Sequence, residues 1–313
     1  MQQITRKMTE KMIKVLCICR NSESSIYNTL LSWKDTADEF HILINNTTDR
    51  TVDEITRTGL KVNVVFFDFT TFSETRNKLL DYVGDFPGYV IFIDDSYELT
   101  NKSLREELLS MDADCVAVRL KRESIVYNRS IIFKSKFRYT GEIHEVPNVL
   151  PTKTIRGVID VIYIDHLLRT QKRKQQDANF LTGNSPRDQY YRACLNPDRT
   201  EKIDLLTLYI CKYSNKYAYL CCLYLADLVH VNYLLIAVNL QPTLSAEPYF
   251  RLYKETNKKC YLEEAHKTCL KMPISDLPID SSFYGTDGII NICFNHSLVM
   301  TEIKNIDNAK WKN

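Results

Sequence analysis

Apolar stretches and helical patterns alternate along the first 95 residues of the chain. Four runs rich in β-branched and aromatic residues are typical of buried parallel strands, namely Met12–Asn21, Glu39–Asn46, Leu60–Phe69 and Tyr89–Asp95. Between them, apolar residues recur at helical spacing behind serine or threonine caps, in Ser22–Asp35, Thr47–Gly59 and Phe72–Asp85. This alternation predicts an α/β fold with a doubly wound, mostly parallel sheet and flanking helices.

The pattern changes after Thr100. Three further strands are predicted at Asp114–Ser124, Arg129–Lys136 and Lys153–His166. From about Lys172 to Lys271 the apolar positions recur with helical periodicity, and the tail beyond contains one predicted helix. We therefore expect two parts, residues 1–170 built around the sheet and residues 171–313 mainly helical.

Composition excludes several classes of protein. The 313 residues carry a formal net charge of +2, so no strong field favours nucleic acid or a membrane surface. The ten cysteines include no CxxC pair, which argues against a zinc ribbon and favours buried, reduced thiols. The polar N-terminal stretch lacks a signal-peptide core, and the most apolar segment, Tyr217–Leu240, is interrupted by Asp227 and His230 and is interpreted as a buried pair of helices. These features predict a soluble, cytoplasmic protein without a transmembrane segment.

Polar pairs follow three of the predicted strands. Arg20–Asn21, Asn45–Asn46 and Asp94–Asp95 each stand where an apolar run ends. In a parallel sheet of this kind, ligands bind beyond the carboxyl ends of the strands. A lone buried carboxylate is costly, so Asp94 and Asp95 are expected to meet water, a cation or a ligand there.

Six motifs occur along the chain in a distinctive order. They are CICRNSE at Cys17–Glu23, TTDRT at Thr47–Thr51, FSETRN at Phe72–Asn77, GDFPGYVIFIDD at Gly84–Asp95, GEIHE at Gly141–Glu145 and DHLLRTQKRKQQDANFL at Asp165–Leu181. Together they resemble the family 2 glycosyltransferases of the GT-A fold, of the soluble type with a helical, tetratricopeptide-like C-terminal part. The resemblance covers about the first 200 residues, and the later ones match only in being helical.

The resemblance implies roles for individual residues. Asp94 and Asp95 would hold Mn²⁺ or Mg²⁺ with His166 as a further metal ligand, and the cation would neutralise the leaving diphosphate. Glu145 would be the general base of an inverting displacement, with Asp95 as the competing base. The other residues implied to bind the nucleotide sugar are Arg20, Asn21, Asn45, Asn46, Arg76, His144, Lys172 and Arg173.

Two positions depart from the family pattern. Ser96 stands where the second acid of Asp-x-Asp is usual, and Asn45 and Asn46 occupy a corner where relatives commonly carry an aspartate. Each implied residue also has a structural alternative: carboxylates that end a strand in solvent, asparagines that cap a turn, an exposed loop glutamate, a structural histidine, and basic residues on a solvated helix.

The resulting hypothesis is an inverting glycosyltransferase of the hexosyl- or N-acetylhexosaminyl-transferase type. It would move a sugar from a nucleotide sugar, expected to be UDP-linked, to a glycan, a lipid-linked sugar or a protein or peptide. The alternative is an inert, glycosyltransferase-like scaffold that binds partners through the helical region. With either function, the helical region is a candidate homodimer interface. A nucleotidyltransferase is disfavoured because CICRNSES contains no glycine for a nucleotide loop.

Overall fold

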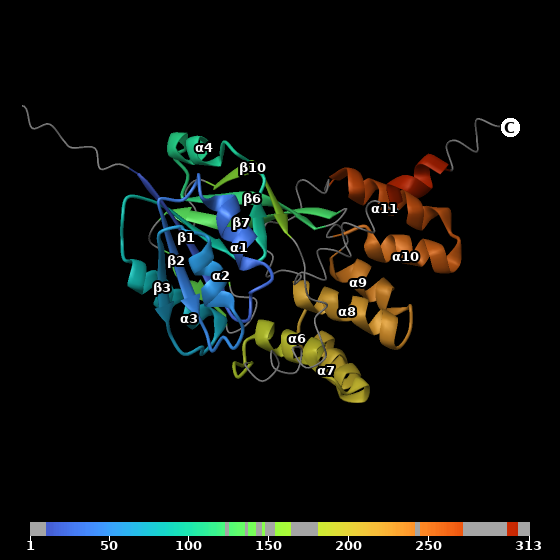
Figure 1. Cartoon of the computed structure of the whole chain (residues 1–313). Coiled ribbons are helices and arrows are strands. Elements are labelled where there is room, and N and C mark those ends of the chain that lie inside the picture. The colour runs from blue at the N-terminus through green and yellow to red at the C-terminus, as the bar shows by residue number, and fades with distance from the viewer. Residues whose placement is uncertain are drawn as a thin grey trace, which may run out of the picture. The chain divides into compact units, whose positions relative to one another are not determined.

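The structure is a computed structural model. It describes residues 11–122, 125–134, 137–141, 146–147, 154–163, 181–241, 245–271 and 299–305 (Figure 1). The chain divides into two compact units, one comprising residues 1–124, 128–141 and 145–166, the other residues 125–127, 142–144 and 167–313. The boundary that the sequence places near residue 170 lies outside the described residues and stays a prediction.

The first unit is built on one large sheet. Its strands are β1 (Met12–Cys19), β2 (Glu39–Ile44), β3 (Val62–Phe66), β4 (Gly88–Ile93), β5 (Tyr97–Leu99), β6 (Cys115–Arg122), β7 (Ile125–Lys134) and β10 (Thr154–Tyr163). Their order is β3-β2-β1-β4-β7-β6-β10-β5. Strands β3, β2, β1 and β4 are parallel, whereas β7 is antiparallel to β4 and β5 is antiparallel to β10. A separate ladder pairs β8 (Tyr139–Thr140) with β9 (Val146–Pro147).

Three helices connect the parallel strands, namely α1 (Ile26–Trp33), α2 (Thr51–Arg57) and α3 (Phe72–Val83). Right-handed crossovers place α1 and α2 on one face of the sheet and α3, whose connection runs in the opposite direction along the sheet, on the other. The Thr71 side chain caps α3 by accepting a hydrogen bond from the Glu74 amide at 3.2 Å, and Gly84 ends it with φ of +67°. The mostly parallel α/β sheet confirms the predicted fold class.

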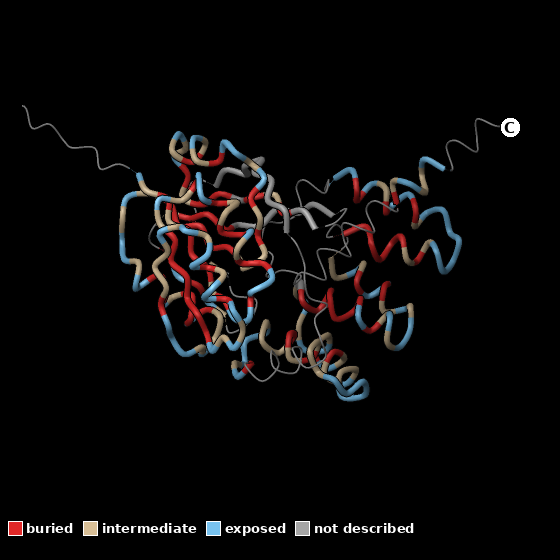
Figure 2. The backbone as a smooth tube through the Cα atoms, viewed as in Figure 1, coloured by how far each residue is buried: buried red, intermediate tan, exposed pale blue. Residues whose placement is uncertain are grey.

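The core of this unit lies on both faces of the sheet, where the buried segments are concentrated (Figure 2). On one face, Leu16 and Leu43 of the first two strands belong to the same cluster as Leu79 of α3. On the other face, α1 buries Leu30 and Trp33 completely. Side chains alternate between the faces of a strand, so near-continuous apolar runs are what a sheet covered on both sides requires.

Strand β5 and helix α4 (Leu104–Ser110) were not predicted. Three residues are too few to show a strand pattern, and β5 depends on contacts distant in sequence. The Trp33 indole donates to the Tyr97 carbonyl at 2.8 Å, and the Leu99 amide donates to the Ser32 hydroxyl at 2.9 Å. The formation of β5 therefore depends on its contacts with α1 and on its pairing with β10.

The second unit is helical, as predicted. Its helices are α6 (Pro186–Leu195), α7 (Arg199–Lys212), α8 (Lys216–Leu228), α9 (Tyr233–Leu240), α10 (Glu247–Thr256) and α11 (Lys259–Lys271), and consecutive helices pack on each other. Ser185 and Asp188 form a capping box at the start of α6. Residues 299–305, in the tail, are also helical, and Glu302 there forms an ion pair with Lys254 of α10 at 3.0 Å.

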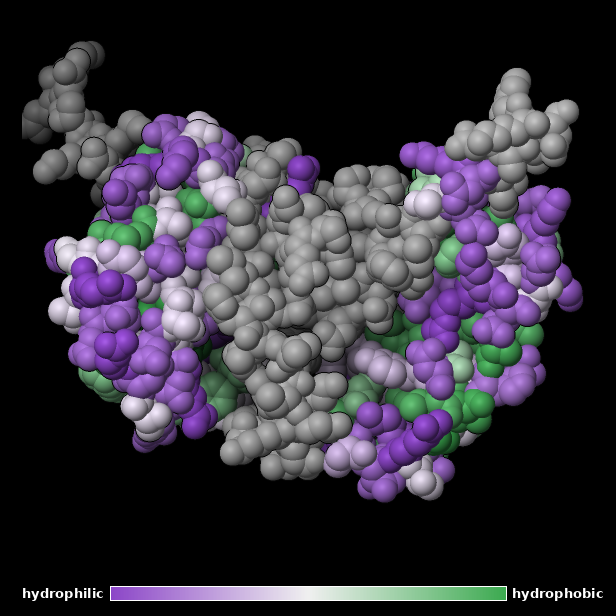
Figure 3. All heavy atoms as spheres, turned by 45° about the vertical axis from the view of Figure 1, so that its right-hand side comes forward, coloured by the Kyte–Doolittle hydropathy of each residue, from purple (hydrophilic) through white to green (hydrophobic). Residues whose placement is uncertain are grey.

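The apolar segment Tyr217–Leu240 forms the predicted pair of helices, α8 and α9. Over the described residues, we find no helix with the length and hydropathy that crossing a membrane requires. Hydrophobic side chains do reach the surface of the helical unit (Figure 3). The exposed ones are Leu208, Tyr224, Val229, Leu235, Ile236 and Leu270.

The expectation of buried thiols is correct for six cysteines and wrong for two. Nine cysteines lie in the described part of the chain, and all nine are free. Cys17, Cys19, Cys115, Cys221, Cys222 and Cys269 are buried. Cys211 and Cys260 are exposed on helices of the second unit, where one side of each helix faces solvent.

A buried histidine makes the stability of the sheet sensitive to pH. His41 of β2 is 6% exposed, and its Nε2 lies 2.9 Å from the Glu39 carboxylate, which also pairs with Lys14 at 3.1 Å. Burial lowers the pKa of His41 from 6.5, outweighing the opposing effect of Glu39. The hydrogen bond from His41 lowers the pKa of Glu39 from 4.5.

The first prediction concerns this histidine. The unfolded chain binds a proton at His41 near pH 6.5, whereas the folded chain does so only at lower pH, so acidification favours unfolding. The stability that depends on a neutral His41 is therefore present in full above about pH 6.5 and is lost as the pH falls below it. Urea denaturation between about pH 7 and about pH 5.5, above the titration of Glu39, should show a larger loss of stability in the wild type than in His41→Gln. Equal losses would contradict this assignment.

Candidate functional site

Polar side chains gather at the carboxyl edge of the parallel strands. Strand β1 pairs with β2 on one side and with β4 on the other. The residues that follow these strands, Arg20–Asn21, Asn45–Asn46 and Asp94–Asp95, therefore lie at one edge. The direction of the connections reverses between β1 and β4, which is the switch point where α/β sheets bind ligands. The structure thus brings together the three polar pairs that the sequence places at strand ends.

Asp94 is paired with a cation from α3. The Arg76 guanidinium lies 3.3 Å from Asp94 Oδ1, and its side chain is only 9% exposed while that of Asp94 is 38% exposed. Arg76 also lies over the rings of Phe92, at 4.8 Å, and Tyr139, at 5.2 Å. A guanidinium held by two rings is fixed in position, so Arg76 places a positive charge beside the carboxylate.

Asn77, the neighbour of Arg76, holds the β8 segment in place. Its side-chain amide donates to the Tyr139 carbonyl at 2.9 Å and accepts from the Tyr139 amide at 2.8 Å. This reciprocal pair fixes the Tyr139 ring that packs against Arg76. The FSETRN motif therefore contributes one residue to the charge at the edge and another to its support.

Asp95 is held by the segment that leads from β1 into α1. The Ser22 hydroxyl donates to Asp95 Oδ2, and the Thr29 hydroxyl donates to the Asp95 backbone carbonyl at 2.9 Å. Both Ser22 and Thr29 are buried. Sequence reasoning missed both residues, although Ser22 belongs to the CICRNSE motif and directly follows the predicted site residue Asn21.

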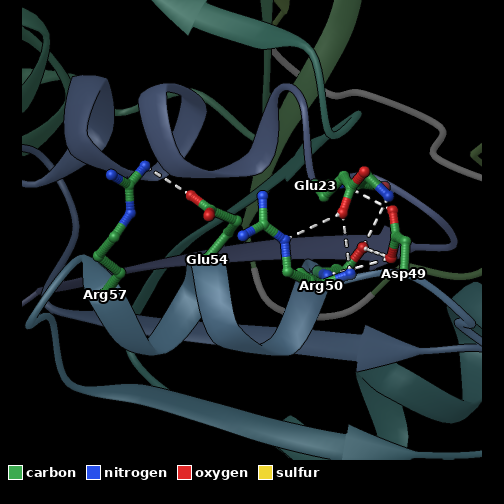
Figure 4. Close-up of polar contacts among 7 residues, drawn as sticks. Glu23, Asp49, Arg50, Glu54 and Arg57 are labelled. Carbon is green, nitrogen blue, oxygen red and sulfur yellow. Dashed lines mark hydrogen bonds and ion pairs between the residues drawn. The ribbon is translucent and has the colours of Figure 1, made fainter.

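The loops after β1 and β2 are interlocked by hydrogen bonds. The Asn21 side chain accepts from the Thr48 amide at 2.9 Å. The Glu23 amide donates to Asp49 at 3.1 Å, and the Arg50 amide donates to Glu23 at 3.0 Å (Figure 4). These bonds satisfy backbone groups of both turns, so the polar edge is preformed. The TTDRT motif acts here as a structural partner of CICRNSE.

The two asparagines after β2 have different surroundings. Asn45 is buried, and its backbone amide donates to the Cys19 carbonyl at 3.0 Å. Among the described residues, its side-chain oxygen has no hydrogen-bond partner. Asn46 is exposed with φ of +40°, a conformation that asparagine tolerates in turns. A buried acceptor without a partner is available to a ligand, whereas Asn46 has the conformation of a structural turn residue.

The sulfur atoms of Cys17 and Cys19 lie behind this edge. They are 3.5 Å apart and buried. The hydrogen bond with Cys19 and burial raise the pKa of the Cys17 thiol well above its usual value, and the charges of Asp95 and Asp94 act in the same direction. The hydrogen bond, the burial and the two negative charges all favour the neutral thiol of Cys17, so this thiol adds no charge next to the two carboxylates.

Several predicted site residues lie outside the described residues. They are His144 and Glu145 of the GEIHE motif, His166, and the basic pair Lys172 and Arg173. The general base and the third metal ligand therefore stay predictions. Arg20 is described, and it is exposed at the end of β1.

The described donor set fits a hard divalent cation in kind but does not complete its coordination. Asp94 and Asp95 supply carboxylate oxygens, which Mn²⁺ and Mg²⁺ prefer. Within the described ranges, no group of three or more His, Cys, Asp or Glu side chains could hold a metal ion. The third predicted ligand, His166, lies outside them.

The fold is an α/β fold, with a mostly parallel sheet flanked by helices and followed by a helical region. Neither a protein-family model nor a curated protein matches the chain.

The chain is similar to several solved structures at low sequence identity. S. aureus TarS matches at 12% identity with a TM-score of 0.43, over 75% of this chain and 55% of that chain. TarS residues 1–349 in complex with UDP-GlcNAc match at 11% identity and a TM-score of 0.41, over 87% and 91% of the two chains. Glucosyl-3-phosphoglycerate synthase from Mycobacterium tuberculosis, in complex with Mn²⁺, UDP and glucosyl-3-phosphoglycerate, matches at 20% identity and a TM-score of 0.30, over 36% and 44%. This chain thus spans about half of the first TarS chain.

The second prediction concerns the Arg76–Asp94 pair. A double-mutant cycle of Arg76→Met and Asp94→Asn, measured by urea denaturation, should give a coupling energy of about 1 kcal/mol. The arginine is largely buried, whereas partial exposure of Asp94 screens the pair and keeps the value moderate.

The matched control is the exposed pair Arg138–Asp81, which is closer at 2.6 Å but 50% and 63% exposed. Its cycle should give a coupling energy below about 0.5 kcal/mol. Additive effects at Arg76 and Asp94 would show that the pair is not energetically linked.

Proposed function

We propose that the protein is a metal-dependent glycosyltransferase that transfers a sugar from a UDP-sugar to a glycan, protein or peptide acceptor. The observation that carries the proposal is the assembly of Arg76, Asp94 and Asp95 beside the polar ends of β1 and β2, at the switch point of the sheet. A nucleotide diphosphate needs both positive charge and hydrogen-bonding groups, and this edge offers them next to each other.

The polar edge suits the two halves of such a donor. The side-chain oxygen of Asn45 is a buried acceptor that could receive an N–H group of the base. Asp94 and Asp95 could hold Mn²⁺ or Mg²⁺, with His166 as the further ligand that the family resemblance implies. A cation bound there would stabilise the charge that develops on the leaving diphosphate.

The acceptor side of the reaction depends on Glu145. We assign it the role of general base on the family resemblance. As the bond between the sugar and the diphosphate breaks, Glu145 would take the proton of the attacking hydroxyl, and the new bond would form on the opposite face of the sugar. Asp95 is the competing base.

An inert scaffold is the second candidate, and the contacts of the two carboxylates favour it. Asp94 is paired with Arg76 and Asp95 accepts from Ser22, so both side chains already have structural partners. With Ser96 in the place of a second acid, these contacts could serve stability alone. Nucleotide binding separates the two candidates.

The third prediction is that nucleotides raise the melting temperature in the presence of Mn²⁺. UDP and UDP-GlcNAc are the first probes, with ADP and GDP as controls. A ligand at about 100 times its dissociation constant adds about 2.7 kcal/mol, which is a visible shift. A shift with UDP compounds that disappears with EDTA would support the metal-dependent transferase. No shift with any nucleotide would favour the scaffold.

The fourth prediction is that Glu145→Gln keeps UDP binding but loses transfer, measured as UDP release from the sugar nucleotide. The amide preserves size and removes the basic oxygen. Loss of a general base typically lowers the rate by about 10²- to 10⁴-fold. Glu106→Gln, an exposed glutamate of α4, is the control for the change in charge and should keep full activity. Unchanged release in Glu145→Gln would remove Glu145 from the mechanism.

A further inference from the structure

Ser22 joins two parts of the candidate site that are far apart in sequence. It is 2% exposed. Its amide donates to the Thr51 hydroxyl at 2.7 Å, and its own hydroxyl donates to Asp95 Oδ2. Its carbonyl accepts from the amides of Ser25, at 3.1 Å, and Ile26, at 3.0 Å. Ser22 therefore contacts the start of α2 and the end of β4 at the same time.

The position of Ser22 is fixed from both directions along the chain. Before it, Asn21 adopts φ of +54° and is bonded to the turn after β2. After it, the two amides of the first turn of α1 hold its carbonyl. The hydroxyl is thus presented to Asp95 by a rigid backbone and not by a flexible loop.

Asp95 is correspondingly restrained at two points. The Thr29 hydroxyl holds its backbone carbonyl at 2.9 Å, and Ser22 holds one oxygen of its carboxylate. A hydrogen bond to a charged carboxylate is stronger than one between neutral groups. The bond from Ser22 restricts the rotation of the Asp95 carboxylate, and it thereby also sets the direction of the other oxygen, Oδ1. Supporting residues of this kind orient metal ligands in proteins.

We propose that Ser22 is a positioning residue that holds Asp95 in the orientation required for binding a divalent cation. This inference rests on the proposed function. If Ser22 has this role, the hydrogen-bonded loops around Glu23 and Asp49 (Figure 4) contribute to cation binding as well as to stability. The turn after β2 supports Ser22 through Thr51, and Ser22 in turn supports the carboxylate after β4.

The test is a titration with MnCl₂, alone and with UDP, in which free Mn²⁺ is followed by electron paramagnetic resonance. Ser22→Ala should weaken Mn²⁺ binding by about 10- to 100-fold, as loss of a supporting hydrogen bond typically does. Ser22→Thr, which keeps the hydroxyl, should retain the wild-type affinity. Ser245→Ala is the matched control and should leave Mn²⁺ binding unchanged, because Ser245 is equally buried but its hydroxyl accepts from the Glu247 amide, at 3.0 Å, in the helical unit.

A double-mutant cycle separates positioning from a general loss of structure. If Ser22 acts through Asp95, Ser22→Ala should cause no further loss of Mn²⁺ affinity in an Asp95→Asn background. Additive losses would overturn the proposal. Should Ser22→Ala fail to fold, as judged by its melting curve, Ser22→Cys replaces it, since a thiol keeps the side chain but is a weak donor.

The outcomes distinguish this inference from the function on which it rests. If the wild type binds no Mn²⁺ with or without UDP, the metal-dependent function and the role of Ser22 are both overturned. If the wild type binds Mn²⁺ and folded Ser22→Ala binds it equally well, only the role of Ser22 is overturned. Weaker binding that Ser22→Thr restores supports the role.

Discussion

The cost of placing two carboxylates directly after a buried strand determines how this edge of the sheet is built. Residues Tyr89 to Ile93 of β4 are all buried, and Asp94 and Asp95 follow at once. An ionised carboxylate that leaves water needs a cation or several donors to offset its desolvation. The chain supplies a different partner for each: a guanidinium from α3 for Asp94 and a hydroxyl from the β1–α1 segment for Asp95.

The partners of the two carboxylates, Arg76 and Ser22, are buried themselves, so they in turn need partners in the surrounding segments. Arg76 is itself largely buried, so it packs against two aromatic rings, one of which is held by Asn77. Ser22, whose hydroxyl donates to Asp95, is itself buried, and its backbone amide donates to the Thr51 hydroxyl. Each buried polar group thus needs the next, and the network is stable when all its members are paired. Among the described residues, the buried side-chain oxygen of Asn45 at the same edge has no hydrogen-bond partner.

The helical unit also buries side chains with a polar group, in this case tyrosines. Tyr190, Tyr209 and Tyr217 are buried, and the centre of the Tyr190 ring lies 6.4 Å from that of Tyr209 and 5.0 Å from that of Tyr217. Burial raises the pKa of Tyr190 and of Tyr209 above the ordinary value. Rings of this size fill the spaces between helices, while a hydroxyl such as that of Tyr209, 3.4 Å from Asn215, can still find a polar partner.

The local pattern of the sequence was sufficient to predict the first four strands, the helices between them and the helical second unit, because period and capping residues are local properties. It also placed Asp94, Asn45 and Asn21 at one edge, since parallel strands end together. It did not predict β5, whose three residues depend on hydrogen bonds with α1 and on pairing with β10. Nor could it assign Ser22 to Asp95, because that contact joins segments separated by 73 residues. Which side chain satisfies which buried charge is decided by packing in three dimensions, where burial and geometry select a partner that no spacing along the chain reveals.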